Sequence, residues 1–261
     1  MKFEDIGIII DIKKHNESSA IIKIFSKNHG IYRGFVKSAF SKKNQSLYQV
    51  GNLISFEWRS RIEENLGNFF YCDIEKSYSS KIIFNKLRLG CFLSLIAIIN
   101  NNFHERELHE SLYLKLIYII ESFADGNLSD RRVIIDYVIF EFELLSELGY
   151  GLDLAKCAVS SSQDNLIYVS PKSGRAVSKE IGDPYGKKIL ALPSFIHCHA
   201  NDLSDENGLD VEISDQDILN GFKLTGFFLE KHIFAVGGKR YDDQQRSLAA
   251  RNVVNILERK D

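Results

Sequence analysis

Cys157 is the residue whose surroundings come closest to a metal site in this chain. It precedes a predicted hairpin over residues 168–178, whose turn reads Pro-Lys-Ser-Gly. That layout is typical of a zinc ribbon, in which two close cysteine pairs supply the four nitrogen or sulfur ligands of tetrahedral zinc. The positions of the other three ligands hold Ser160, Ser178 and Ile181. The pattern therefore predicts a ribbon-like module that keeps its shape without zinc.

The remaining chemically capable side chains form no catalytic motif. Residues 197–199 read His-Cys-His, but sequence neighbours on alternating faces make a poor tetrahedral site. There is no G-x-x-x-x-G-K-[ST], G-x-S-x-G or H-E-x-x-H sequence. We expect no catalytic residue, no metal and no cofactor. A metal-dependent nuclease stays open as an alternative, because scattered carboxylates can converge on Mg²⁺.

Basic side chains are concentrated near the start of the chain. Between Lys13 and Arg61, ten lysines and arginines stand against two acids, a local balance of +8. The whole chain carries −2, so the remainder carries −10. Such a segment can bind a polyanion at one end of a protein that repels it elsewhere. The plain alternative is a set of solvated lysines on a small β-domain.

Binding to a nucleic-acid strand needs cations that reach phosphates and exposed rings that stack on bases. Lys42 and Lys43 fall on a long polar loop between two predicted strands, and Phe40 on the same loop is the best stacking candidate. Trp58 shares a strand face with other apolar residues, so we expect it in the core. The predicted DNA-binding residues are Lys13, Lys14, Lys23, Arg33, Lys37, Phe40, Lys42, Lys43, Arg59 and Arg61.

Cysteine usage and the absence of long apolar runs indicate the compartment. The four cysteines are scattered without a C-x-x-C pair, which fits reduced thiols in a cytoplasm. Residues 1–5 have no signal-peptide layout, and the longest apolar run, 91–99, is too short to span a bilayer. We expect a soluble, cytoplasmic protein with no membrane partner.

Residues 1–78 show the period-two alternation of β-strands, with turn residues between the runs. The alternating runs are 6–12, 20–24, 32–36, 54–58 and 70–74. In the fifth run, Phe70, Cys72 and Ile74 share one face. Five short strands suit a five-stranded Greek-key barrel of the OB type, although an SH3-like barrel would give nearly the same pattern.

From Lys81 the apolar spacing changes to three or four residues, which indicates helices. One buried helix is expected over 82–99, a second over 108–123, and a third from Ser129 to Gly149. Ser214 and Asp217 have the spacing of a capping box that opens a later helix, and a last helix is expected over 243–258. The fold class is therefore α+β.

The predicted domains are an OB-type barrel over 1–78 and a helical domain over 79–261. The ribbon-like insert interrupts the helical domain at 150–192. A structural zinc commonly contributes on the order of 10 kcal/mol to such a module, so without it the insert must be held by packing. Lys172 and Arg175 lie at its turn, where they either contact DNA or are simply solvated.

The order of these segments resembles the RecO family of bacterial DNA repair and recombination mediators. The resemblance covers the ribbon layout, a strand and turn, a basic loop, two further strands and the later helices. The segments that carry it are 17–30, 37–43, 51–61, 66–69, 148–150 and 224–232. Each motif is short, but together they run in order over most of the chain.

The resemblance implies a protein without enzymatic activity that binds single- and double-stranded DNA, anneals complementary strands and helps load recombinase. It also implies a RecR-type partner protein and docking of the acidic, Phe-ended C-terminal tail of single-strand-binding protein. Arg131 and Arg132, at a predicted helix start, are the cations proposed for that tail. An RNA-binding barrel protein is a further alternative.

Overall fold

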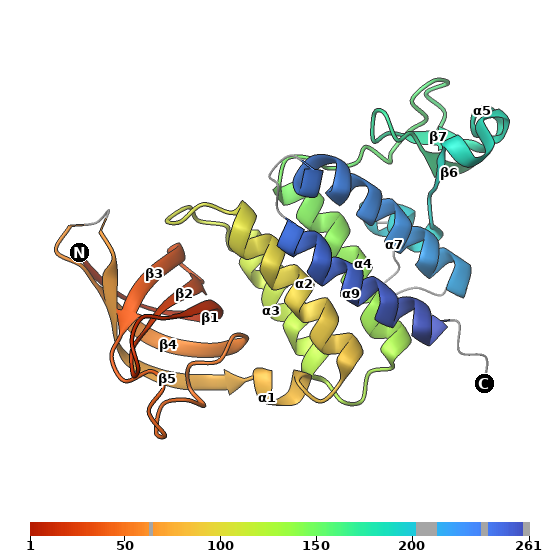
Figure 1. The fold of residues 1–261 in the computed structure, drawn as a ribbon. Coiled ribbons are helices and arrows are strands. Elements are labelled where there is room, and N and C mark those ends of the chain that lie inside the picture. Colours follow the sequence, from red (N-terminus) through yellow and green to blue (C-terminus); the bar gives the residue numbers. More distant parts are fainter. Residues whose placement is uncertain (63–64, 202–212, 236–239, 258–261) are drawn as a thin grey trace. The chain divides into compact units, whose positions relative to one another are not determined.

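The computed structural model describes residues 1–62, 65–201, 213–235 and 240–257 (Figure 1). The chain divides into two compact units, Met1–Leu128 and Ser129–Asp261. The first unit contains all five strands of a barrel and three helices, and the second contains a helical bundle with a small three-stranded sheet. The expected α+β class, with the strands first and the helices after them, is confirmed.

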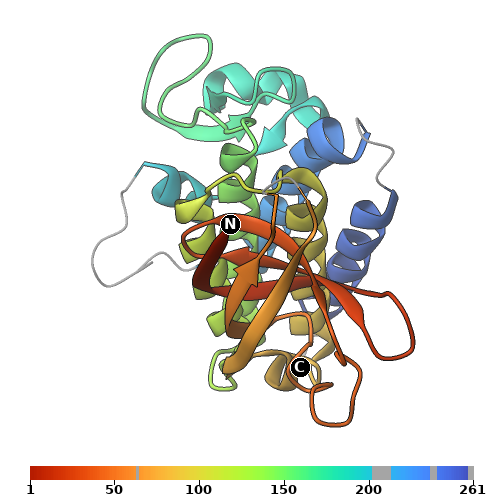
Figure 2. The same ribbon diagram turned by 90° about the vertical axis from the view of Figure 1, so that its left-hand side faces the viewer.

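Five strands close into a barrel in the order β1-β2-β3-β5-β4, and β4 pairs back to β1 (Figure 2). The strands are β1 (Lys2–Lys14), β2 (Ala20–Ser26), β3 (Gly30–Val36), β4 (Asn52–Arg59) and β5 (Gly67–Ser77). Closure depends on a short parallel pairing of β3 with β5, whereas all other pairs are antiparallel. This is the five-stranded arrangement of an OB-type barrel.

The barrel interior is filled by the inward residues of the alternating strands. Ile24, Ile54 and Trp58 are fully buried there, which confirms the core position expected for Trp58. The indole nitrogen of Trp58 donates to the carbonyl of Arg33 at 3.0 Å, so its one polar group is satisfied. A Cβ at Gly67 would lie 2.1 Å from the Trp58 ring, so this position accepts only glycine.

Strand β1 is buried on both faces because helices of the same unit cover part of the barrel. Ile9 points into the barrel core, while Ile8 and Ile10 are buried on the other face. Phe25 of the neighbouring strand contacts the Tyr113 ring edge-on at 5.6 Å. The helices of this unit are α1 (Ser79–Ile82), α2 (Lys86–Asn102) and α3 (Glu110–Ala124).

The single helix predicted over 82–99 is interrupted between α1 and α2. Ile83 and Phe84 are 59% and 89% exposed, although both are apolar. The carboxamide oxygen of Asn85 accepts the backbone N–H of Arg88 and so caps a new helix at this point. Asparagine favours such a cap over the helix interior, which explains the break.

Phe70, Cys72 and Ile74 do not share one face of the fifth strand as expected, because Cys72 packs against the barrel core while Phe70 does not. Phe69 points inward and is 5% exposed, whereas Phe70 and Ile74 are 41% and 43% exposed. The pairing of β4 with β5 has irregularities, and Tyr71, which follows the two phenylalanines, adopts a positive φ of 48°. A bulge of this kind shifts the alternation of a strand, so a simple period of two assigns the wrong side.

The second unit is organised around packed helices. They are α4 (Asp130–Glu147), α6 (Ser194–Ala200), α7 (Asp215–Leu229), the π-helical turn η2 (Glu230–Phe234) and α9 (Arg240–Leu257). Ser129 caps α4 by accepting from the backbone N–H of Arg132, and Ser214 with Asp217 forms a complete capping box on α7. Both predicted helix starts are therefore confirmed.

The ribbon-like insert lies between α4 and α6 in the sequence. Its strands are β6 (Leu166–Val169), β7 (Ala176–Ser178) and β8 (Leu190–Ala191), which form a sheet in the order β7-β6-β8. A short helix α5 (Lys179–Gly182) and the 3₁₀ turn η1 (Asp183–Lys188) connect β7 to β8. The predicted hairpin is thus present as β6 and β7.

Candidate nucleic-acid interface

One outward-facing row of side chains crosses four strands of the barrel and ends on the fifth. Strand pairing places Lys13 beside Ile21, Ile21 beside Phe35, Phe35 beside Asn68, and Asn68 beside Arg59. All five side chains are exposed or half-buried. The row therefore puts a half-buried aromatic ring between two predicted DNA-binding cations on the surface of the barrel.

A second row on the same strands contains Asp11, Lys23 and Arg33, which are paired in register. Here the cations already have protein partners. The Lys23 ammonium donates to the carbonyl of Asn100 at 2.8 Å, and burial lowers the pKa of Lys23. Arg33 Nε lies 2.6 Å from a carboxylate oxygen of Glu105. These two side chains are less free to bind phosphate than the sequence suggests.

The loop between β3 and β4 presents the clearest set of free cations. Lys37, Lys42 and Lys43 are exposed. Phe40 is 40% exposed, and its backbone N–H donates to the carbonyl of Ser18 at 3.1 Å, which fixes the loop against the neighbouring turn. This loop therefore holds an exposed ring among three lysines.

Arg59 is held by its own strand and by the rings that follow. Its guanidinium forms an ion pair with Glu57, which also binds Lys2 at 2.7 Å. Hydrogen bonds from Arg59 and then Lys2 lower the pKa of Glu57, against the raising effect of burial. The guanidinium also lies 4.9 Å from the Phe70 ring centre and 5.8 Å from that of Tyr71.

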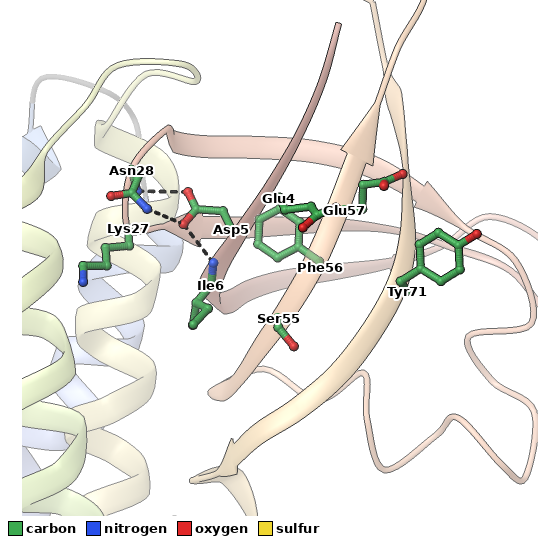
Figure 3. A pocket seen from close by; sticks show the side chains of 9 residues that line it. All are labelled: Glu4, Asp5, Ile6, Lys27, Asn28, Ser55, Phe56, Glu57 and Tyr71. Atoms are coloured by element: carbon green, nitrogen blue, oxygen red, sulfur yellow. Dashed lines mark hydrogen bonds between the residues drawn. The ribbon is translucent and has the colours of Figure 1, made fainter.

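Phe70 and Tyr71 are candidate stacking residues that the sequence interpretation missed. Both are exposed on β5 beside the Arg59 guanidinium, and Tyr71 also lines the hollow shown in Figure 3. The aromatic pair itself was visible in the sequence, but the bulge that exposes both rings was not. By contrast, Tyr32 and Tyr48, also interleaved with the basic residues, are buried in the barrel core.

The predicted DNA-binding residues thus separate into free and engaged cations. Lys23, Arg33 and Arg59 are engaged by the contacts above, and Lys13 lies 3.5 Å from Asp11. Within the described ranges, the other five predicted cations form no ion pair. They are Lys14, Lys37, Lys42, Lys43 and Arg61.

A hollow of about 590 Å³ opens on another part of the barrel, formed by β1, β4, β5 and the turn after β2 (Figure 3). Three carboxylates line it, those of Glu4, Asp5 and Glu57, with Lys27 at its edge. Asp5 accepts hydrogen bonds from the backbone and side-chain nitrogens of Asn28 at 2.9 and 2.8 Å. Carboxylates repel phosphates, so this hollow does not extend the basic face.

The two arginines predicted for a partner tail are both engaged inside the second unit. Arg131 forms an ion pair with Asp215 and donates to the carbonyl of Ile213. Arg132 Nε lies 2.8 Å from a carboxylate oxygen of Asp136, one helical turn further along α4. Any acidic ligand at this place must compete with carboxylates of the protein itself.

The ribbon-like insert does not supply the donors that zinc requires. Cys157 is fully buried and accepts a hydrogen bond on Sγ from the backbone N–H of Ser178 at 3.4 Å. Serines stand where second and third thiolates would bind, and neutral hydroxyls are not ligands that structural zinc sites use. The set around Cys157 therefore does not fit tetrahedral zinc.

Hydrogen bonds hold the Cys157 sulfur in place of a metal. Burial raises the pKa of this thiol, but hydrogen bonds from the Ser160 side chain and from backbone N–H groups of Ser160, Ser178 and Val159 outweigh it. The result is a pKa lowered to about 6. A largely ionised sulfur at neutral pH acts as the common acceptor of the loop that surrounds it.

Residues 197–199 lie on α6, and they are not gathered with other metal ligands. His199 Nε2 is 3.0 Å from a carboxylate oxygen of Glu143. Burial lowers the pKa of His197. Over the described part of the chain, no group of three or more His, Cys, Asp or Glu side chains could hold a metal ion.

The barrel and its row of cations define the class to which the first unit belongs. It is an OB-fold unit, a class whose second and third strands and adjoining loops bind oligonucleotides or oligosaccharides. Residues 1–78 match the family profile described as "Recombination protein O N terminal" and residues 85–240 match "Recombination protein O C terminal". The chain belongs to the RecO family of DNA repair proteins.

Relatives from one bacterial genus match the chain at nearly full length. A "DNA repair protein RecO" from Rickettsia peacockii is 44% identical over 234 residues, which is 90% of this chain and 92% of that protein. Those from Rickettsia rickettsii and Rickettsia typhi are 43% and 40% identical over the same coverage. Among the helices described, none is long and apolar enough to cross a membrane.

Proposed function

We propose that this protein is a non-enzymatic recombination mediator that binds single- and double-stranded DNA on the outer face of its barrel. It anneals complementary strands and helps load recombinase onto DNA coated by single-strand-binding protein, as a cytoplasmic, nucleoid-associated protein. The observation that carries this proposal is the outward row from Lys13 through Phe35 to Arg59, flanked by the loop that bears Lys42 and Lys43.

The chemistry of this function is electrostatic. Each cation that neutralises a phosphate releases condensed counterions, so affinity falls with salt by a slope of about 0.7 per contact for single strands. If the five predicted cations that are not engaged each bind one phosphate, the slope of log K against log salt is about −3.5. Phe35 and Phe40 then supply stacking that does not depend on the base sequence.

Two protein partners complete the proposal. A RecR-type protein and the acidic tail of single-strand-binding protein are the partners that the family resemblance implies. Arg131 pairs with Asp215 and Arg132 pairs with Asp136. A carboxylate of the tail would therefore have to replace one of these carboxylates in order to bind either arginine. Such exchange favours a weak, reversible contact, which suits a protein that must release the tail.

The decisive experiment is annealing of complementary oligonucleotides by the purified protein in rising salt. We expect fast annealing at low ionic strength that declines steeply as salt increases. Absence of annealing at low salt would contradict the proposal. A parallel incubation of labelled DNA with Mg²⁺ or Mn²⁺ should leave the strand length unchanged, and shortening would instead indicate a nuclease.

A further inference from the structure

Three rings form a column in the second unit, beside the turn of the ribbon-like insert. The His232 ring lies 4.5 Å from the Tyr150 ring at an interplanar angle of 13° and 6.1 Å from the Phe228 ring at 5°. Phe228 is fully buried, His232 is half-buried, and Tyr150 is 40% exposed. The buried ring therefore fixes the orientation of a column whose exposed end is Tyr150.

Two lysines stand beside this column. The Lys231 ammonium lies 5.7 Å from the Phe228 ring centre and donates to the carbonyls of Pro171 and Lys172 at 2.8 and 3.3 Å. These bonds tie the insert's turn to η2. Lys172 is exposed and forms no ion pair within the described ranges. Both lysines, Tyr150 and His232 line one hollow of about 190 Å³.

The lining of the hollow indicates the ligand. The described lining contains two cations, an imidazole and a glycine-containing turn but no carboxylate. Burial, and then the charge of Lys231, lower the pKa of His232, which keeps the imidazole neutral at neutral pH and suited to stacking. A ligand with a planar ring and an adjacent anion satisfies both the exposed ring and the lysines. A nucleotide within a single strand has both groups.

We propose that Tyr150, Lys172 and Lys231 form a second strand-binding site, with a base stacked on Tyr150 and its phosphate held by Lys172, while Lys231, which donates to the Pro171 and Lys172 carbonyls, adds positive charge beside it. The inference rests on the proposed function and deepens it, because annealing brings two strands together and two sites would let one molecule hold both. The barrel would hold the first strand and the ring column the second. A rigid ring pays little conformational entropy on stacking, which favours this use of Tyr150.

The test is photocrosslinking of a short oligonucleotide carrying 5-bromodeoxyuridine to the full-length protein, with crosslinked peptides identified by mass spectrometry. We expect two sets of peptides, one from the barrel and one containing Tyr150. Tyr150→Leu should lower the yield of the second set roughly 5-fold or more, because stacking on one ring changes affinity by at least that factor. Tyr150→Phe should retain the yield, since stacking needs the ring and not the hydroxyl.

Matched controls separate this site from a general effect on the unit. Tyr185 is an exposed tyrosine of the insert outside the ring column, so Tyr185→Leu should leave the second set unchanged. Lys172→Gln, compared with Lys187→Gln, removes one exposed charge without touching a ring. Lys172→Gln should slow annealing at low salt, whereas Lys187→Gln should not. This comparison keeps the inference testable if Tyr150→Leu fails to fold.

The outcomes are distinguishable. Crosslinks confined to the barrel would overturn the second site and leave the proposed function intact. Crosslinks nowhere, with no binding of the oligonucleotide, would overturn the proposed function as well. Unchanged crosslinks and annealing in Tyr150→Leu, with loss of binding to a partner protein, would assign the ring column to that protein and also overturn the second strand-binding site.

Discussion

Arg33 Nε lies 2.6 Å from the carboxylate of Glu105, a residue that follows α2 in the chain. The ion pair neutralises a predicted DNA-binding cation on the second row of the barrel. Glu105→Gln should release Arg33 and remove a negative charge beside the strand. We expect affinity for single-stranded DNA at low salt to rise roughly 2- to 5-fold, the size of one exposed ion pair.

The matched control is Glu107→Gln. Glu107 is an exposed acid two residues further on; its carboxylate lies 3.7 Å from His109, and within the described ranges it forms no ion pair with a barrel cation. The Glu107→Gln substitution removes the same charge as Glu105→Gln without freeing Arg33. Equal gains from both variants would show that net charge, and not release of the arginine, sets affinity. Fluorescence anisotropy of a labelled oligonucleotide measures both.

Lys42 and Lys43 should matter more than the engaged cations. Both are exposed and form no ion pair within the described ranges, so each can neutralise a phosphate without giving up a protein contact. Lys42→Ala with Lys43→Ala should make the salt slope of single-strand binding shallower by about 1.4. Replacing Lys187 and Lys188, an exposed pair in the insert, is the control. An unchanged slope in the barrel variant would remove this loop from the interface.

The second unit depends on one buried carboxylate. Glu141 of α4 is fully buried, accepts from Arg246 of α9 at 2.7 and 2.9 Å and from the Thr225 hydroxyl of α7 at 2.6 Å. It therefore joins three helices. Glu141→Gln leaves a partly buried guanidinium without its counter-charge, a change that costs about 3–5 kcal/mol.

Urea unfolding followed by circular dichroism measures how far Glu141→Gln lowers the free energy of unfolding. Glu180→Gln removes an exposed carboxylate from the same unit and should change the free energy of unfolding by less than about 0.5 kcal/mol. If both variants unfold at the same urea concentration as the unmodified protein, the buried pair is not a stabilising junction of these helices.

Ionisation of Cys157 should make the stability of the insert depend on pH. The hydrogen bonds to its sulfur favour the thiolate in the folded state and lower the pKa to about 6, whereas an unfolded thiol has a pKa of about 8.5. The stabilisation is therefore fully present above the unfolded value and is lost as pH falls through the folded value. We expect the insert to weaken between about pH 8.5 and pH 6.

Hydrogen exchange of the amides in β6 and β7, corrected for the intrinsic pH dependence of exchange, follows this effect. Cys157→Ala should flatten the change in protection across that pH interval and lower protection most at the higher pH. Parallel curves for the two proteins would show that the sulfur is not the titrating group. The barrel strands of the same sample provide the internal reference.

The alternation of apolar residues was enough to predict the five strands but not how they close. Closure rests on the pairing of Gly34 with Gly67, residues far apart in sequence, and no local pattern predicts it. The same limit applies to Lys23 and Arg33, whose partners Asn100 and Glu105 come from beyond the barrel. The shared face expected for Phe70, Cys72 and Ile74 was wrong because a bulge interrupts the alternation of β5.

The sequence therefore indicated which basic residues could form the proposed site on the barrel, but not which of them are already engaged by other groups of the protein. The loop with Lys42 and Lys43 was recognisable because polar residues separate two strands in the sequence. The ring column was not, since Tyr150 and His232 are distant in the chain and meet only through tertiary packing. Short-range patterns identify surfaces made by one segment, and they miss surfaces that three segments build together.

Phe40 gives the most direct test of stacking at the barrel. Its ring is exposed on a loop whose backbone is anchored to the carbonyl of Ser18, so Phe40→Leu removes an aromatic face without removing core packing. We expect single-strand affinity to fall roughly 5-fold or more with an unchanged salt slope, because a ring contributes stacking and no charge. Phe84→Leu, at the most exposed phenylalanine of the same unit, should leave affinity unchanged. A loss of slope in Phe40→Leu would mean that the substitution moves the neighbouring lysines, and an unaltered affinity would exclude this ring from the interface.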